Sequence, residues 1–301
     1  MRANARYYLG RLIKIGKLTE DMIIDAIKNS ATIQKSMYSY TFTNIRIFNT
    51  GNKVDGIFAR LSKYTPQASV KVVRPDQHQM DDENVDNLIE ASSPFVYIPA
   101  FSGIAYQHVW NHLQRKQFPR LFSGLIIAKH SDFFQSCEVD PITDMRTFAT
   151  RLSRLDVINS LRSTVKPPNP LFGPCWKSLK EYIKKRRLDE VIISEDSEGG
   201  INTNVSEIAQ QMVSDEIVSP DNITSRMETL MGGIGDAAVL MAADGYGSAK
   251  VEGKEAGKTV IIRTSENQKS FSFKKDPDPK ELLKLAHDEF KKINDKRYLK
   301  H

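Results

Sequence analysis

A proline-rich break between residues 166 and 175 constrains the fold of this chain more than any other feature of its sequence. An alternating apolar run, Val157–Val165, ends at the break. Three prolines within the next five residues are compatible with neither a central strand nor a helix interior. A helical pattern then runs from Trp176 to Arg187. The break therefore predicts a boundary between two domains or subdomains.

Strand and helix patterns alternate irregularly on both sides of the break, and several strand patterns are adjacent. This order favours an α+β fold with mixed or antiparallel sheets and packed helices over a doubly wound parallel sheet. We predict one α+β domain at residues 1–165 and another at residues 166–301. The second domain is expected to end in a β-meander after Gly245, followed by a terminal helix with Asp278 as its N-cap.

Four predictions concern the middle of the first domain. Residues 69–73 are expected to form a strand, and the acidic residues 76–93 an exposed loop with a short helix. Residues 102–117 are expected to form a helix with Trp110 facing inward, which Pro119 ends. Residues 122–128 are then expected to form a strand.

The composition bounds the class of protein. Of the 301 residues, 40% are hydrophobic and 27% are charged, which is enough for a folded core. The longest apolar runs are far shorter than the roughly 20 residues of a membrane-spanning helix. The first six residues lack the apolar centre of a signal peptide. Two cysteines, Cys137 and Cys175, cannot form a disulfide framework. We expect a cytoplasmic protein without membrane attachment.

The densest positive charge follows the proline-rich break. Four cations form one stripe of the predicted helix, opposite Trp176, Leu179 and Ile183, and two more widen the stripe. These six residues are Lys177, Lys180, Lys184, Lys185, Arg186 and Arg187. Basic residues in a last turn complement the helix dipole, but one or two suffice for that. The stripe therefore predicts contact with the phosphates of nucleic acid, without sequence preference.

A second, weaker basic region lies at the start of the chain. Residues 1–75 contain 13 Lys and Arg against 4 Asp and Glu. The candidate binding residues there are Arg2, Arg6, Arg11, Lys14 and Lys17. Such an imbalance is typical of a surface that meets nucleic acid or an acidic protein. The alternative is a solvated face on which the cations are scattered.

An alternative function is a Mg²⁺-dependent nuclease. Asp244, Glu252 and Lys254 supply the residue types of such a site, because carboxylates hold the metal and a lysine orients or polarises the attacking water. The same residues also fit an exposed hairpin. His108 and His112 are metal-ligand candidates, since a helix would place them four residues apart on one face. Val109 stands where a zinc protease needs glutamate, so solvent-facing histidines are the alternative.

Three further motifs are better explained by structure than by chemistry. Gly253–Thr259 has three residues between its glycines where a phosphate-binding loop needs four, and a hairpin turn is expected there. Gly233–Ala238 has the letters of a dinucleotide-binding loop, but no strand precedes it. Cys175 lies near a helix start without an adjacent base, and is expected to be buried.

We therefore expect a cytoplasmic, non-enzymatic binding protein with an electropositive surface. It would engage nucleic acid or an acidic protein, or act as a subunit of a larger assembly. A protein–protein adaptor in a bacterial antiviral defence or regulatory system is a further alternative. No cofactor is expected, apart from Mg²⁺ if the nuclease alternative holds.

Overall fold

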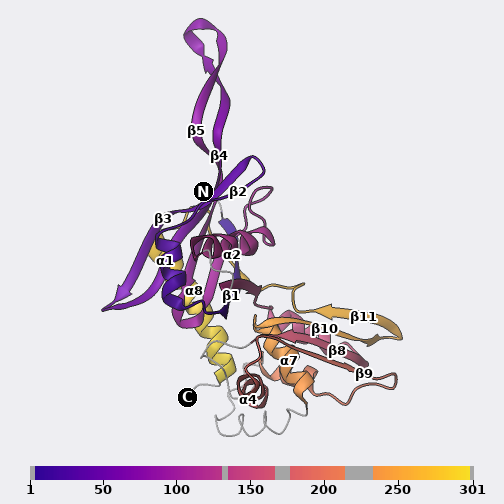
Figure 1. Ribbon diagram of the computed structural model, residues 1–301. Helices are drawn as coiled ribbons and strands as arrows, with labels where there is room; N and C mark the ends of the chain where they lie inside the picture. The colour runs from indigo at the N-terminus through magenta and orange to yellow at the C-terminus, as the bar shows by residue number, and fades with distance from the viewer. Residues whose placement is uncertain (1–3, 131–134, 167–176, 214–232, 299–301) are drawn as a thin grey trace.

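The computed structural model describes residues 4–130, 135–166, 177–213 and 233–298. Within these ranges the chain is an α+β protein with two antiparallel sheets, one of eight strands and one of four. The predicted fold class is thus confirmed. The larger sheet and its helices form a body, from which a smaller lobe and a long hairpin project (Figure 1). The body comprises residues 4–142 and 269–298, and the inserted lobe comprises residues 143–268.

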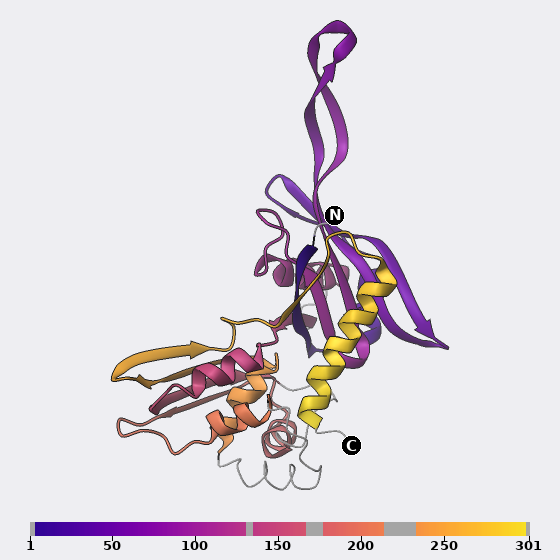
Figure 2. The same cartoon turned by 180° about the vertical axis from the view of Figure 1, so that it is seen from behind.

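The body sheet has the strand order β12-β1-β6-β5-β4-β3-β2, and β7 also pairs with β1. Its strands are β1 (Asn4–Gly16), β2 (Ile33–Lys35), β3 (Tyr38–Thr50), β4 (Lys53–Arg74), β5 (Gln79–Ile98), β6 (Gly103–Gln107), β7 (Gln135–Pro141) and β12 (Ser270–Lys274). Its helices are α1 (Glu20–Lys28), α2 (Gln117–His130) and α8 (Pro279–Tyr298). Side chains alternate across a strand, so Ile57 packs with α1 and α2, whereas Phe58 packs with α8 (Figure 2). Helices therefore close both faces of the body sheet.

The outer parts of β4 and β5 form a long arm beyond the body (Figures 1 and 2). The two strands stay paired out to Arg74 and Gln79, with only the short 3-10 turn Pro75–Gln77 between them. The prediction of a loop and short helix at residues 76–93 was wrong. A strand that is exposed on both faces needs no apolar alternation, so its sequence reads as a polar loop.

The predictions for residues 102–117 and 122–128 were also wrong. Residues Gly103–Gln107 are strand β6, which is buried on both faces and so lacks the alternation of a half-buried strand. Helix α2 begins at Gln117 and buries Phe118, Leu121, Phe122, Leu125 and Ile126. Pro119 lies in the first turn of α2, where the missing N–H has no intrahelical partner to lose.

The inserted lobe leaves and rejoins the body at one place. Strands β7 and β12 lie end to end along the same edge of β1, with β12 on residues 4–8 and β7 on residues 10–16. Between them the backbone N–H of Lys269 donates to the Ile142 carbonyl at 2.7 Å, and Leu9 N–H donates to the Lys269 carbonyl at 3.0 Å. Residues 143–268 therefore enter the fold between two strands that share one partner.

The inserted lobe is a four-stranded sheet with the order β11-β10-β8-β9. Its elements are β8 (Val157–Val165), β9 (Val191–Asp196), β10 (Gly247–Glu255), β11 (Lys258–Arg263), α3 (Met145–Leu152), α4 (Lys177–Arg186), α5 (Val205–Gln211) and α7 (Ile234–Ala243). Helix α7 is the centre of this lobe, since every residue from Gly235 to Ala243 is buried. The expected boundary between residues 165 and 166 falls inside the lobe, between β8 and α4. The division into domains at that position stays a prediction.

The end of the chain returns to the body. The three strands predicted after Gly245 all form, but β10 and β11 make a hairpin in the inserted lobe, whereas β12 pairs with β1. The terminal helix has the predicted cap, because Asp278 Oδ1 accepts hydrogen bonds from the backbone N–H of Lys280 (2.9 Å) and Glu281 (3.0 Å).

A buried arginine joins the two parts. Arg11 of β1 is 1% exposed, and its Nη2 lies 3.5 Å from Oδ1 of Asp244, which ends α7. Its Nη1 donates to the Phe101 carbonyl at 2.5 Å, and the guanidinium lies over the rings of Tyr246 and Phe290. Arg11 therefore contacts the body sheet, α8 and the inserted lobe at once.

Among the helices that the structure describes, none is both long and apolar enough to cross a membrane.

Candidate nucleic-acid interface

The predicted basic helix forms as α4, but only part of its stripe can be placed. Lys185, Arg186 and Arg187 are exposed. The side chains of Lys177, Lys180 and Lys184 lie outside the described residues. The stripe therefore stays a prediction.

The N-terminal cations do not gather into one patch. Arg6 is exposed near the start of β1, and Lys17 is exposed just beyond its end, roughly 36 Å away at the rise of an extended strand. Lys14 lies between them, 3.9 Å from Glu20. Arg11 is the buried residue that joins the body to the inserted lobe. Arg2 lies outside the described residues.

The structure does not bring the nuclease candidates together. Asp244 is buried against Arg11. Glu252 is on the open face of β10, where it pairs with Lys250 at 2.8 Å, and Lys254 is exposed two residues further along. No group of three or more His, Cys, Asp or Glu side chains in the described ranges could hold a metal ion.

The two glycine-containing motifs have structural roles. Gly253–Thr259 spans the β10–β11 hairpin, as predicted, with Ala256 and Gly257 in the left-handed region at its turn. Gly233 is the N-cap residue of the buried helix α7. Cys175 lies outside the described residues. Burial raises the pKa of the other thiol, Cys137, to about 12, so Cys137 is a buried apolar residue rather than a nucleophile.

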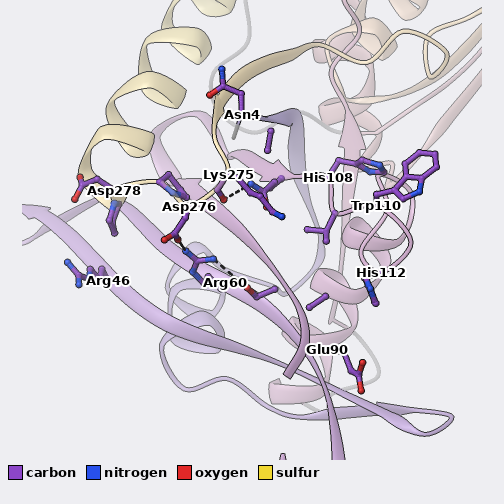
Figure 3. A pocket seen from close by; sticks show the side chains of 17 residues that line it. Asn4, Arg46, Arg60, Glu90, His108, Trp110, His112, Lys275, Asp276 and Asp278 are labelled. Atoms are coloured by element: carbon purple, nitrogen blue, oxygen red, sulfur yellow. Dashed lines mark hydrogen bonds and ion pairs between the residues drawn. The ribbon is translucent and has the colours of Figure 1, made fainter. Parts of the chain in front are cut away.

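An open groove of about 1280 Å³ lies on the body beside the loop that follows β6 (Figure 3). Strands β3, β4 and β5 form one wall, residues 275–279 form another, and the loop residues 108–112 form the rim. We call it the Trp110 groove. It gathers cations from parts of the chain that are far apart in sequence, namely Arg46, Arg60 and Lys275.

The loop presents Trp110 rigidly. Val109 and Leu113 exchange both backbone hydrogen bonds at 3.0 Å, Leu113 is fully buried, and Asn111 adopts a left-handed conformation. Trp110, at the tip, is 75% exposed, so the prediction that it faces inward was wrong. Its ring meets that of His108 edge-on, with 5.9 Å between centroids.

His108 is fixed by its neighbours rather than available for a metal. Its Nδ1 accepts a hydrogen bond from the Arg115 backbone N–H at 3.1 Å. Burial, with a smaller effect of the Arg115 charge, lowers the pKa of His108 below its usual value, which favours the neutral ring. The helix that would place His108 and His112 on one face is a strand and a tight turn. Their four-residue spacing therefore has no metal-binding significance here.

The charges of the Trp110 groove are only partly neutralised. Arg60 pairs with Asp276 and also donates to Ser92 Oγ at 3.4 Å (Figure 3). In contrast, Arg46 and Lys275 are exposed and form no ion pair with any residue that the structure describes. Arg6 is adjacent, because its carbonyl accepts the His108 backbone N–H at 3.0 Å. An exposed aromatic ring and two cations without an ion pair among the described residues, Arg46 and Lys275, thus line one groove, which the acids Glu90, Asp276 and Asp278 also line.

A second cleft, of about 420 Å³, lies between α2, β7 and the base of the inserted lobe. We call it the Asp140 cleft. Arg115, Lys116 and Arg120 line it. Asp140 Oδ2 is buried there without a hydrogen-bond partner, and burial raises the pKa of this carboxyl to about 6 against the opposing charge of Lys166. The sequence shows Asp140-Pro141 only as a turn, so this site was not foreseen.

The family DUF4747, a domain of unknown function, matches residues 19–216. The chain belongs to this family. The match includes β3 to β6 and the Trp110 loop, but not β1, β12 or α8. Arg46 and Trp110 are therefore inside the matched DUF4747 segment, whereas Arg6 and Lys275 lie outside it. No curated protein matches the chain.

Proposed function

We propose that this DUF4747 protein is a cytoplasmic, non-enzymatic protein that binds nucleic acid without sequence preference at the Trp110 groove. The observation that carries the proposal is the exposed Trp110 on a rigid loop beside uncompensated cations. Aromatic side chains stack with any base, and such stacking contributes about 1–3 kcal/mol per base. Cations that meet the phosphates are the other half of such a site, and the unpaired Arg46 and Lys275 supply them in this groove.

The geometry favours a single strand. Trp110, at the loop tip, is 75% exposed, and a base must leave its own stack to lie against its ring. Phosphates on either side of that base would meet Arg46 and Lys275, with Arg6 next to His108. Arg60 is already paired with Asp276, so it contributes less charge. Both DNA and RNA fit this description.

The proposal is tested by fluorescence anisotropy of labelled single- and double-stranded DNA and RNA, titrated across salt. Trp110→Ala is expected to weaken single-strand binding by about tenfold, whereas Trp110→Phe keeps most of it, because stacking needs a ring. Arg46→Ala with Lys275→Ala is expected to lower the slope of log affinity against log salt by about 1.4, at roughly 0.7 per phosphate contact.

The matched control is Lys258→Ala, which removes an exposed cation from the β10–β11 hairpin. It should leave both affinity and slope unchanged. Unaltered binding by Trp110→Ala would overturn the proposed site. Loss of binding in a variant with Lys185, Arg186 and Arg187 changed to Glu, but not in Trp110→Ala, would assign the activity to α4 instead.

A further inference from the structure

The β4–β5 arm, residues 65–90, has a composition opposite to that of the rest of the chain. It holds two cations, Lys71 and Arg74, against six acids, a net charge of −4. Since the whole chain carries +6, the remaining residues carry +10. A strongly acidic arm is repelled by phosphates, and only Glu90 at its base lines the Trp110 groove, so a different role is sought for the rest of the arm.

Most acids of the arm lack a cation. Arg74 Nε pairs with Asp81 Oδ2 at 2.6 Å, and Glu90 accepts a hydrogen bond from Thr65 at 2.9 Å. No ion pair with another described residue compensates the remaining four, which are Asp76, Asp82, Glu83 and Asp86. This charge is available to a partner.

The arm also exposes apolar side chains. Val73 and Met80 face each other across the strands near the tip and are 64% and 70% exposed, and Ile89 is 64% exposed. Along the arm, cross-strand pairing joins Ala68 with Val85. A lone two-stranded hairpin is marginally stable in water. An arm of roughly 33 Å, held by nine cross-strand pairs, therefore gains stability when its faces are covered.

We propose that the arm docks on the Asp140 cleft of a second copy of this chain. Charge complementarity carries this choice. Arg115, Lys116 and Arg120 line that cleft, and none of the three forms an ion pair with the residues that the structure describes. Of the two acids that also line it, Glu138 is paired with Lys166, so Asp140 alone opposes the three cations. Tyr106, Pro119 and Val139 supply apolar lining for the arm's own apolar side chains.

The area supports a reciprocal exchange. A face of roughly 33 Å by 10 Å covers about 330 Å², which is below what a stable interface buries on one partner. Two arms exchanged about a twofold axis double the buried surface and satisfy both clefts. Two arms packed against each other would instead bring their like charges together. The inference does not depend on nucleic-acid binding.

The test is sedimentation velocity on nuclease-treated full-length protein over a concentration series at low and high salt. The wild type is expected to form a dimer that weakens as salt screens the charges. Asp82→Arg with Glu83→Arg reverses the arm, and Lys116→Glu with Arg120→Glu reverses the cleft. In each variant alone, the dissociation constant of the dimer is expected to rise at least about tenfold, because arm and cleft then repel each other.

An equimolar mixture of the two reversed variants is the decisive sample. The positive arm then meets a negative cleft, and the negative arm meets a positive cleft, so the mixed dimer is expected to recover. Asp189→Arg with Glu198→Arg makes the same charge change on exposed sites of the inserted lobe and should keep the dimer. Circular dichroism checks that every variant is folded.

Two outcomes overturn the proposal. One is a wild type that stays monomeric at every protein and salt concentration. This holds even if the arm of that monomer binds a different, basic protein. The other is a wild-type dimer that both reversed variants retain. Loss of dimerisation with intact single-strand affinity would separate this inference from the function proposed for the Trp110 groove.

Discussion

The body and the inserted lobe handle their surface charges differently. On the open face of the inserted sheet, Arg162, Lys250 and Arg263 are in register across three strands. Each has an acidic partner, namely Asp196 at 3.6 Å, Glu252 at 2.8 Å and Glu266 at 3.4 Å. The body sheet is closed by helices on both faces, and several cations without an ion pair among the described residues lie in the Trp110 groove and the Asp140 cleft. A row of cations that are each paired with an acid is thus weaker evidence for ligand binding than a few cations that have no acidic partner.

The ion pairs on the inserted sheet also differ in burial from the ion pair at the junction between the lobe and the body. Ion pairs on the inserted sheet are exposed and contribute about 0–1 kcal/mol each. The Arg11–Asp244 pair is buried at the one place where β1, α8 and the inserted lobe meet. Variants that compare these positions measure how much of the stability resides in the junction.

The largest effect is expected for Asp244→Ala. It leaves the Arg11 guanidinium buried without its carboxylate, which costs about 3–5 kcal/mol. Urea unfolding measures the loss. Glu252→Ala removes an acid from the open face of β10, and is expected to cost no more than about 0.5 kcal/mol. Equal losses in the two variants would contradict the distinction between junction and open sheet.

A smaller effect is expected for Gly103→Ala in the body. A Cβ on Gly103 would lie 2.6 Å from the Phe290 ring, so α8 must shift away from the sheet. Overpacking of this kind costs about 1–3 kcal/mol. Gly199→Ala in the inserted lobe meets nothing within 4 Å and serves as the control. Thermal unfolding compares them, and a stable Gly103→Ala would show that α8 is held loosely.

The smallest effect on stability is expected for Asp140→Asn in the Asp140 cleft, and this effect depends on pH. Folding raises the pKa of Asp140 from its usual value of 3.8 to about 6, so the folded state holds this proton more tightly than the unfolded state. The carboxyl therefore imposes no penalty well below pH 4, a penalty that grows between about pH 4 and pH 6, and a constant penalty at higher pH. Asp140→Asn is expected to stabilise the protein by about 1–2 kcal/mol at pH 7.5, allowing for partial exposure.

Unfolding of wild type and Asp140→Asn between pH 4 and 8 measures this difference. The two curves should converge at low pH, apart from a constant offset. Asp189→Asn, which makes the same substitution at an exposed position, is the control. A difference that stays constant over the whole range would mean that Asp140 titrates normally in the folded protein.

Elements with one buried face were predicted well. Helix α8, with apolar residues at helical spacing and Asp278 as its cap, was found from sequence, as was the alternating strand β8. Elements with an unusual environment were not. Strand β6 is buried on both sides and the arm is exposed on both sides, so neither shows the alternation of a half-buried strand.

The candidate site was foreseen only in fragments. Arg6 and His108 were singled out, but as parts of a basic patch and a metal site. Trp110 was assigned to a helix face because an apolar residue is expected to be buried. Arg46 and Lys275 meet in the Trp110 groove from positions more than 200 residues apart, and no local pattern signals such a contact. The single entry and exit of the inserted lobe is likewise a contact between distant residues.

The interrupted course of the body has a consequence for biosynthesis. Translation releases the chain from its N-terminus, so β12 and α8 emerge only after the 126 residues of the inserted lobe. At about 5–20 residues per second, that delay lasts roughly 6–25 s. Throughout it, the side of the sheet that holds Leu9, Phe58 and Ile98 lacks its helix. A nascent or truncated chain that stops before Pro279 therefore displays an apolar face that a finished chain conceals, which chaperones and proteases can recognise.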